Sequence, residues 1–234
     1  MNMKIALIGD LHGNFIATQA LEKELRRQQA EEIWFLGDAV GKGPQNAETC
    51  DWVRANCRVC IGGNWDYGIG GREFPEDGYF WNQLGEERLT WLKNLPRETD
   101  AWISGVHFRL FHGRPVTPLL SVQDDKALFA QAFRANGETY TGIIFADSHR
   151  PFVRTLNDGY ALNTGSVGNS MGVPKAHALL MDGDLGSREA SVLTMTILSV
   201  PYDNEAAADI ARQDMHLPHR ESYIREVLTG VYSR

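Results

Sequence analysis

The chain has 234 residues, 43% of them hydrophobic, and a formal net charge of -7 at pH 7. This length predicts one domain over residues 1–234, with a core of about 1–200, a helical extension of about 201–234, and no need for disulfides to stabilise it. The acidic balance excludes the extended basic surface that is typical of nucleic-acid-binding proteins, so a polyanion would bind only locally, through metal.

The sequence shows no sign of a targeting or membrane-spanning segment. The first apolar run ends at Gly9-Asp10 without the small-residue cleavage site of a signal peptide. The longest apolar stretch, Ser191 to Val200, is far shorter than the roughly 20 residues that span a bilayer. We therefore expect a cytoplasmic protein with no membrane partner.

The three cysteines, Cys50, Cys57 and Cys60, do not form a disulfide framework, and their odd number indicates reduced thiols. The spacing of Cys57 and Cys60 also occurs in redox and zinc sites. A zinc site needs a second pair of ligands, and a thioredoxin-like motif opens a helix, whereas residues 58–61 predict a strand. We therefore favour ordinary thiols over either site.

Residues 1–61 alternate buried apolar runs with amphipathic segments, which predicts a β-α-β-α-β opening. The expected strands are 4–8, 33–36 and 58–61, and the expected helices are 15–29 and 47–55. Each strand is followed by glycine and then by polar residues. Because ligands of open α/β sheets bind outside the carboxyl ends of the strands, we expect these three loops to meet at one site.

The region from 66 to 105 is rich in aromatic side chains and predicts irregular structure, with one helix at about 86–95 that Pro96 ends. From 101 to 111 the apolar pattern has period two, which predicts a hairpin turning near Gly105. Beyond it we expect a helix at about 126–135 and short strands at 141–145, 152–156, 160–163, 176–181 and 192–200.

Two amphipathic helices are expected in the C-terminal extension, one at 204–213 and one from Pro218 to just before Gly230. The second presents an apolar face formed by Tyr223, Ile224, Val227 and Leu228. We expect this face to dock on the domain's own core rather than to form a dimer interface. The oligomeric state itself is not indicated by the sequence.

The polar residues after the strands are of types that bind metal ions. Asp10 and His12 lie two residues apart at a strand end, where alternation directs both side chains the same way. Asp38 adds a carboxylate, which can bridge two cations with its two oxygens, and Asn64 adds an amide oxygen. Downstream strands are followed by His112, Asp147 and His149. Such a mixed shell of oxygen and nitrogen suits Mn, Fe or Zn better than Ca.

The order of these pieces resembles the calcineurin-like metallophosphoesterases, whose pattern is Asp-x-His, Gly-Asp, Gly-Asn-His-Asp/Glu, His-Gly and Gly-His-x-His. The resemblance covers about residues 4–182 and fits best the bacterial branch of YfcE-like phosphodiesterases, which the segments 37–44, 91–96 and 162–168 also match. It implies an α/β (α+β) fold: a four-layer αββα sandwich of two mixed sheets flanked by helices, with a dinuclear metal site at the strand ends. It also implies a phosphoesterase that hydrolyses phosphate mono- or diesters with a metal-bridging hydroxide.

Carried over by position, the resemblance implies that one ion is held by Asp10, His12, Asp38 and His149. The other ion takes the bridging Asp38 with Asn64 and His112, and Asp147 stands where the family has a second histidine. The residues that this assignment makes catalytic are Asp10, Asp38, Asn64 and His112.

Asp147 is the first departure from the family pattern, and two interpretations remain open. As a ligand it would harden the shell and add negative charge, which favours Mn or Fe over Zn. As a non-ligand it would leave the second site weak or empty. We favour ligation, because a carboxylate is a competent donor for these metals.

Trp65 is the second departure, because many family members have a histidine there that protonates the leaving group. A missing general acid costs about 10²-fold or more, mainly on substrates with poor leaving groups. YfcE-like proteins also lack this histidine, so activity is not excluded. We therefore predict a preference for aryl or nucleotide esters over simple alkyl phosphates.

The substrate is less well determined than the metal site. Arg114 and Arg150 follow ligand-bearing segments and are candidates, with Asn64, for binding phosphate oxygens, although both arginines equally suit a solvated surface. A small phosphorylated molecule is expected, with nucleotides and phosphoproteins among the candidates. The aromatic residues at 74–91, with Trp65 and Tyr67, could stack on a nucleobase, but a small core under a long loop is the simpler interpretation.

The alternative to an enzyme is an inactive scaffold of the same fold that acts in protein interaction, as does a retromer subunit that resembles this family. The departures at Trp65 and Asp147 motivate it. Against it, the other ligand positions match, and burying a cluster of carboxylates is costly unless they bind something.

Overall fold

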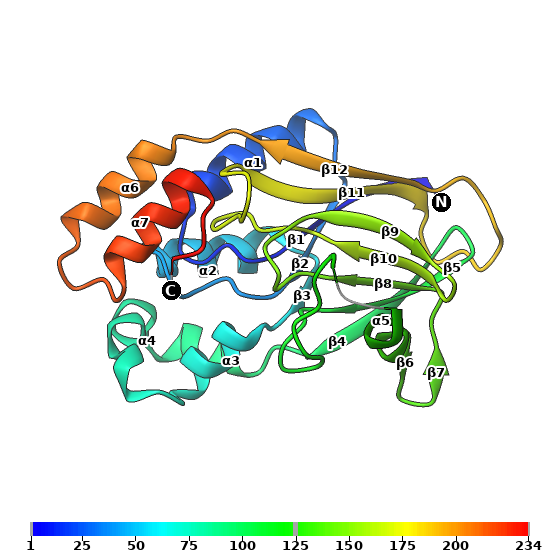
Figure 1. Ribbon diagram of the computed structural model, residues 1–234, viewed down its shortest axis with the longest axis horizontal. Helices are drawn as coiled ribbons and strands as arrows, with labels where there is room; N and C mark the ends of the chain where they lie inside the picture. Colours follow the sequence, from blue (N-terminus) through cyan, green and yellow to red (C-terminus); the bar gives the residue numbers. More distant parts are fainter. Residues whose placement is uncertain (1, 124–125, 234) are drawn as a thin grey trace.

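The computed structural model describes residues 2–123 and 126–233. Two five-stranded sheets of these residues pack face to face, and helices cover their outer faces (Figure 1). The first sheet has the strand order β12-β11-β1-β2-β3 and the second has the order β4-β5-β8-β10-β9. The fold is therefore the predicted sandwich of two mixed sheets flanked by helices.

The first sheet is built largely from the β-α-β-α-β opening. Its parallel strands are β1 (Asn2–Ile8), β2 (Glu32–Leu36) and β3 (Val59–Ile61), and its antiparallel strands are β11 (Ala176–Asp184) and β12 (Thr194–Val200). Helices α1 (Phe15–Arg27) and α2 (Asn46–Asn56) connect the parallel strands. The three parallel strands and the two helices of this opening lie within two residues of the predicted bounds.

The second sheet begins with the predicted hairpin, which turns between Ile103 and Val106. Its strands are β4 (Glu98–Ile103), β5 (Val106–Phe111), β8 (Gly142–Phe145), β9 (Phe152–Leu156) and β10 (Gly159–Asn163). The strands β5, β8 and β10 run parallel to one another, so their carboxyl ends lie at the same edge.

The helix expected at 126–135 is shorter in the structure, where α5 spans Lys126–Ala132. A short hairpin of β6 (Arg134–Ala135) and β7 (Glu138–Thr139) replaces its last turn. Asn136 and Gly137 both have positive φ between these strands, and an Asn-Gly pair favours such a two-residue turn. The expected end of this helix was therefore wrong, because the Asn136-Gly137 pair forms a hairpin turn where a helix was predicted.

The period-two alternation of the strands separates three apolar cores. In β1, Ile5 and Leu7 face the core between the two sheets, whereas Ile8 faces the core beneath the helices of the first sheet. In β8, Ile144 faces the other sheet and Phe145 faces the core that includes α5. Alternating side chains on both sheets thus fill all three interfaces of a four-layer arrangement.

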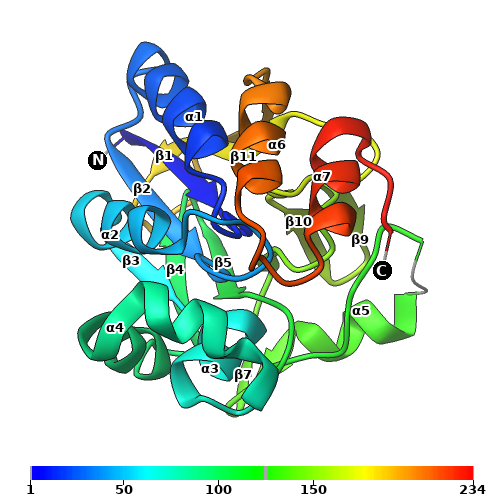
Figure 2. The same cartoon turned by 90° about the vertical axis from the view of Figure 1, so that its left-hand side faces the viewer.

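The C-terminal extension forms α6 (Asn204–Gln213) and α7 (Arg220–Thr229). The predicted apolar face packs on the same core as α1 and β1: Tyr223, Ile224 and Val227 are buried there, and Leu228 lies against it. Both helices lie at the end of the molecule to which the parallel strands point, across the strand-end loops from α4 (Figure 2). The expectation that this face docks on the protein's own core is confirmed.

The irregular structure expected after residue 65 was wrong, because most of it is helical. Helix α3 spans Asn64–Gly71, a 3-10 turn covers Pro75–Asp77, and α4 spans Gly78–Lys93 with a break at Gly85. Glycines within α3 hide its helical periodicity. Its first turn is stabilised instead by the buried Asp66 carboxylate, which accepts a 3.0 Å hydrogen bond from the backbone N–H of Gly63.

Cys57 caps the end of α2 and Cys60 lies in β3, so the Cys-x-x-Cys pair does not open a helix. Cys50, Cys57 and Cys60 are free thiols. Within residues 2–123 and 126–233, no helix is long and apolar enough to cross a membrane.

Candidate metal centre

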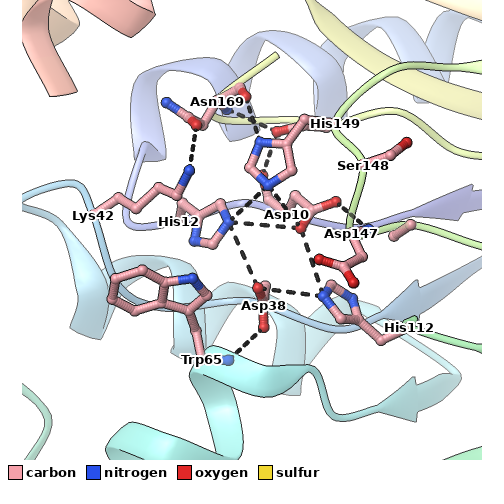
Figure 3. A network of polar contacts seen from close by, with 12 residues as sticks. Asp10, His12, Asp38, Lys42, Trp65, His112, Asp147, Ser148, His149 and Asn169 are labelled. Atoms are coloured by element: carbon pink, nitrogen blue, oxygen red, sulfur yellow. Dashed lines mark hydrogen bonds and ion pairs between the residues drawn. The ribbon is translucent and has the colours of Figure 1, made fainter. Parts of the chain in front are cut away.

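The polar residues predicted at the strand ends meet at one edge of the sandwich. Asp10 and His12 follow β1, and Asp38 follows β2; the two loops are joined by backbone hydrogen bonds from Asp10 N to Gly37 O (2.9 Å) and from His12 N to Asp38 O (3.1 Å). His112 follows β5 and His149 follows β8. Figure 3 shows their side chains pointing toward one another.

The backbone at this edge has an unusual conformation. The φ angles are positive, between 47° and 62°, at Asp10, His12, Asp38, Asp147 and His149. Residues other than glycine rarely adopt this left-handed conformation, which costs on the order of 1–3 kcal/mol each and persists where the surrounding structure enforces it. Such strain is a feature of functional sites, and here it accompanies the convergence of the side chains.

The ligand-type atoms form two overlapping groups, each compact enough to hold a metal ion. One contains Asp10, His12 and His149, and the other contains Asp10, Asp38 and His112. Asp10 belongs to both groups, and Asp38 Oδ2 lies 3.7 Å from His12 Nε2 and 3.3 Å from His112 Nε2. All five side chains are buried, with exposed fractions between 0 and 7%.

Each histidine is oriented by a hydrogen bond to a backbone carbonyl. Nδ1 contacts the carbonyl oxygen of Val40 for His12 (3.0 Å), of Leu36 for His112 (2.7 Å) and of Asn169 for His149 (2.6 Å). A carbonyl only accepts, so Nδ1 carries the proton and Nε2 is the atom that faces the centre. Metal-binding histidines are fixed in this way in proteins.

Several buried polar atoms at the centre have no hydrogen-bond partner among the described residues. They include Asp10 Oδ1, Asn64 Oδ1 and His112 Nε2. In addition, His12 Nε2 and His149 Nε2 lie 3.3 Å apart, although neither has a proton to donate when both rings are neutral. Buried polar atoms without partners in this part of the chain fit a bound cation, so these residues are suited to a metal site.

The electrostatics of the centre are dominated by its carboxylates. Burial alone would raise the pKa of both Asp10 and Asp38. Nevertheless His149 and His12 hold the pKa of Asp10 well below its usual range, and His112 lowers the pKa of Asp38. Burial opposes the charged form of His112, but Asp38 and Asp10 raise its pKa well above 6.5. The site thus keeps both carboxylates ionised and attracts positive charge.

Comparison with known proteins identifies the family. Residues 3–184 match the model of the calcineurin-like phosphoesterase superfamily domain, which is more than half of the chain. The chain belongs to the calcineurin-like phosphoesterase superfamily. The protein is therefore a hydrolase of phosphate esters from a metal-dependent family, and the family indicated by the residue pattern is confirmed.

Two curated relatives of this calcineurin-like phosphoesterase show what its sequence matches. An uncharacterized protein of Methanocaldococcus jannaschii is 27% identical over 210 residues, which is 76% of this chain and 82% of the relative. A symmetrical bis(5'-nucleosyl)-tetraphosphatase of Erwinia tasmaniensis is 36% identical over 67 residues, or 27% of this chain and 24% of the enzyme. The second match is therefore local.

Solved structures show the same fold. A metallophosphoesterase from Sphaerobacter thermophilus gives a TM-score of 0.75 at 24% identity and covers 98% of this chain and 99% of its own. A hypothetical protein from Pyrococcus horikoshii gives 0.77 at 23%, with coverage of 99% and 100%. The phosphoesterase YfcE from E. coli gives 0.50 at 18%, with coverage of 85% and 100%.

The first departure from the family pattern, Asp147, is bound by an arginine. Arg114 donates to both carboxylate oxygens, from Nη2 to Oδ1 (2.6 Å) and from Nε to Oδ2 (2.9 Å), and its backbone N–H donates to Oδ2 (3.0 Å). Asp147 is outside both compact groups of ligand atoms in the described residues. Its ligation therefore stays a prediction, and a metal ion would have to share its carboxylate with Arg114.

The second departure, Trp65, supplies an apolar wall. Its ring makes edge-to-face contacts with His12 (5.8 Å between centroids) and with Phe80 (6.3 Å), and its backbone N–H donates to Asp38 Oδ1 (2.9 Å). Trp65 thus packs over the metal centre from the position of the family's histidine. Tyr67 points elsewhere, because its hydroxyl donates to the backbone carbonyl of Pro96 (2.9 Å).

The centre opens into a cavity of about 790 Å³. Arg114 and Arg150, the predicted phosphate-binding residues, both line it, together with Asp38, Asn64 and Asp147. Apolar side chains form another part of its wall: Trp65, Ile69, Phe74, Phe80, Leu119 and Met171. Both charged and apolar side chains therefore line the cavity that a ligand would occupy.

Sequence reasoning missed the role of Asp66. Its fully buried carboxylate accepts from the backbone N–H of Asp38 (2.7 Å) and of Ala39 (2.9 Å) as well as from Gly63, and burial raises its pKa to about 7. Asp66 thereby joins the loop of Asp38 to the helix that begins with Asn64. The sequence did offer a signal, because Asp66 occupies the last position of the family's Gly-Asn-His-Asp/Glu pattern.

Proposed function

We propose that the protein hydrolyses phosphate mono- or diesters at a centre of two divalent metal ions. The observation that carries this proposal is the set of buried acceptors without partners, together with histidines whose Nε2 atoms are turned to one point by backbone carbonyls. When bound, two divalent ions would activate water and neutralise charge on the phosphate. Mn or Fe is favoured over Zn by the carboxylate content of the shell.

The ligand assignment follows the two halves of the centre. We assign Asp10, His12, Asp38 and His149 to one ion and Asp38, Asn64 and His112 to the other, with Asp147 as a further ligand to the second. Asp38 would be shared by both ions, as in the family pattern, and its Oδ2 lies within 3.7 Å of both His12 Nε2 and His112 Nε2. Asn64 contributes the buried Oδ1 for which no described residue is a partner.

Residues of this chain also orient the substrate. Arg114 is half exposed while it holds Asp147, so its guanidinium lies at the cavity where a phosphate oxygen can contact it. Trp65 excludes water on the side where the leaving group of many relatives would receive a proton. Leaving groups that depart without a proton, such as nitrophenolate or a nucleoside phosphate, are therefore the expected substrates.

A nucleotide substrate has separate support. The match to symmetrical bis(5'-nucleosyl)-tetraphosphatases, although local, concerns enzymes that are named for nucleotide substrates. The apolar wall formed by Phe74, Phe80 and Leu119 gives a base or an aryl group a surface on which to pack. We propose a small aryl or nucleotide phosphate ester as the substrate class.

The test is turnover of bis-p-nitrophenyl phosphate and of a nucleotide panel by the purified protein, first stripped of metal and then loaded with Mn. Mn-dependent release of nitrophenolate is expected, and the stripped protein should be inactive. An inactive scaffold would show no such turnover while keeping the fold, which circular dichroism would verify.

A further inference from the structure

The C-terminal extension forms part of the wall of the metal-site cavity. Pro218 and His219, which precede α7, and Tyr232, which follows it, all line this cavity. All three lie beyond residues 3–184, the part of the chain that matches the family. The extension therefore adds to the cavity a wall that is not part of the family domain.

A second wall is formed by the segment that joins α3 to α4, from which Phe74 and Asp77 line the same cavity. Figure 2 shows α3 and α4 on one side of the strand-end loops and α7 on the other. Two contacts bring these walls together. The Tyr79 hydroxyl in α4 donates to Asp214 Oδ2 of the extension at 2.5 Å. Burial raises the pKa of Asp77, and His219 opposes this shift, so these two side chains are also neighbours.

The backbone is held in place on both sides of Tyr232. Before it, the carbonyl oxygen of Gly230 accepts from the backbone N–H of Gly172 (2.8 Å), which follows a residue of the cavity wall. After it, the backbone N–H of Ser233 donates to Glu226 Oε1 (3.1 Å). The position of Tyr232 is therefore set by the protein before any ligand binds, which lowers the entropic cost of binding.

Glu226 connects this tail to the metal centre. It is fully buried in α7, and its Oε2 accepts from Asn169 Nδ2 at 3.0 Å. The backbone oxygen of Asn169 orients His149 (2.6 Å), and its Oδ1 accepts from Lys42 Nζ (2.7 Å). One hydrogen-bonded network therefore places the tail relative to a candidate metal ligand.

Each wall carries an aromatic ring that is exposed at the cavity. The exposed fractions are 58% for Tyr232 and 51% for Phe74. Covering such rings with apolar surface is favourable, and aromatic rings pack well on one another. A flat aryl group or nucleobase, attached to a phosphate at the metal centre, would cover rings of this kind. A small aliphatic leaving group would leave them in contact with water.

We propose that Tyr232 and Phe74 form a subsite for the aromatic part of the substrate, in which the C-terminal tail covers one face of the ring and the α3–α4 segment covers the other. The inference rests on the proposed function and names the residues that select its substrate class. The extension thus determines specificity, because Tyr232 lies outside the family domain. Metal binding and attack on phosphorus do not depend on this subsite.

The test compares two probes that are not hydrolysed, phenylphosphonate and methylphosphonate, and measures their binding to the Mn-loaded protein by calorimetry. Both carry the same phosphonate group, so only the first reports on the ring subsite. Tyr232→Ala should weaken binding of phenylphosphonate roughly 3- to 10-fold, as expected for a lost aromatic contact, and should leave methylphosphonate binding and metal content unchanged. Tyr232→Phe keeps the ring and should bind phenylphosphonate as wild type does.

Two further variants test the walls separately. Val231→Ala shortens the exposed neighbour of Tyr232, which does not line the cavity, and should bind both phosphonates as wild type does. Phe74→Ala should weaken binding of phenylphosphonate alone, and the double variant with Tyr232→Ala should lose more than either single variant. In both single variants KM for bis-p-nitrophenyl phosphate should rise more than kcat falls. If Tyr232→Ala does not fold by circular dichroism, Tyr232→Gln takes its place.

Unchanged phenylphosphonate affinity in folded Tyr232→Ala would overturn the inference, while Mn-dependent turnover by wild type upheld the proposed function. Equal losses for both phosphonates would also overturn it, because they would show that Tyr232 supports the structure of the site rather than a ring. A Mn-loaded wild type that binds neither phosphonate and shows no turnover would overturn the proposed function, and this inference with it.

Discussion

The two halves of the metal centre are held in different ways. Around His12 and His149, the rings are oriented by backbone carbonyls and the ligand types follow the family pattern. Around His112, the ring is also fixed by a carbonyl, but its neighbour Asp147 is held by the half-exposed side chain of Arg114. Backbone carbonyls thus orient both rings of one half, whereas in the other half the Asp147 carboxylate is held by the Arg114 guanidinium as well as by a backbone N–H.

The largest effect is expected where the halves share a ligand. Asp38→Asn removes the bridging charge and should lower kcat/KM for bis-p-nitrophenyl phosphate by about 10³-fold, or about 4 kcal/mol. Steady-state kinetics with Mn measures it, and Asp51→Asn, at an exposed site on α2, is the control. Activity close to wild type in Asp38→Asn would refute the account of two ions.

The difference between the halves is measured directly by metal binding. His149→Ala should weaken one Mn site by roughly 100-fold or more, whereas Asp147→Asn should weaken the other by about tenfold, because Arg114 already shares that carboxylate. Calorimetric titration of the stripped proteins gives both affinities. No loss in Asp147→Asn would exclude it as a ligand, and equal losses would remove the proposed inequality of the halves.

The Trp65 side chain beside His12 leads to a prediction about the leaving groups that the enzyme prefers. Trp65→His should raise the rate on simple alkyl phosphates by up to about 10²-fold, with little change for p-nitrophenyl esters, because only the former need a proton donor. Trp65→Phe keeps an apolar ring and is the matched control. Equal wild-type rates on alkyl and aryl esters would contradict the prediction.

The last prediction concerns stability away from the centre. Burial lowers the pKa of His177 from 6.5 to about 4, and the ring contacts the hydroxyls of Ser170 and Ser199. Because the unfolded chain takes up this proton first, stability should fall between pH 6.5 and 4, by at most about 3 kcal/mol. Urea unfolding of chelated protein should show a smaller pH dependence in His177→Gln than in wild type. The same slope in both would show that His177 is not responsible.

Short-range patterns in the sequence predicted most of the fold. Strands such as β1 and β2 carry their own alternation, and the loop residues Asp10, His12 and Asp38 follow them directly. The helix α3 was missed because its stability comes from Asp66 and the neighbouring loop, which are tertiary contacts. In the same way, no local pattern links Lys42 to Asn169, which is 127 residues away, or Asn169 to Glu226, which is 57 residues away.

The left-handed backbone under the ligands also limits how this centre can change. Asparagine, aspartate and histidine adopt positive φ more readily than other residues with a side chain, and β-branched residues do so at high cost. At position 147, where φ is 62°, an exchange between histidine and aspartate is therefore one that the main chain accepts without refolding. The residues that these positive-φ positions accept most easily, Asn, Asp and His, can all bind a metal ion. Substitutions that the backbone tolerates there therefore tend to exchange one metal ligand for another.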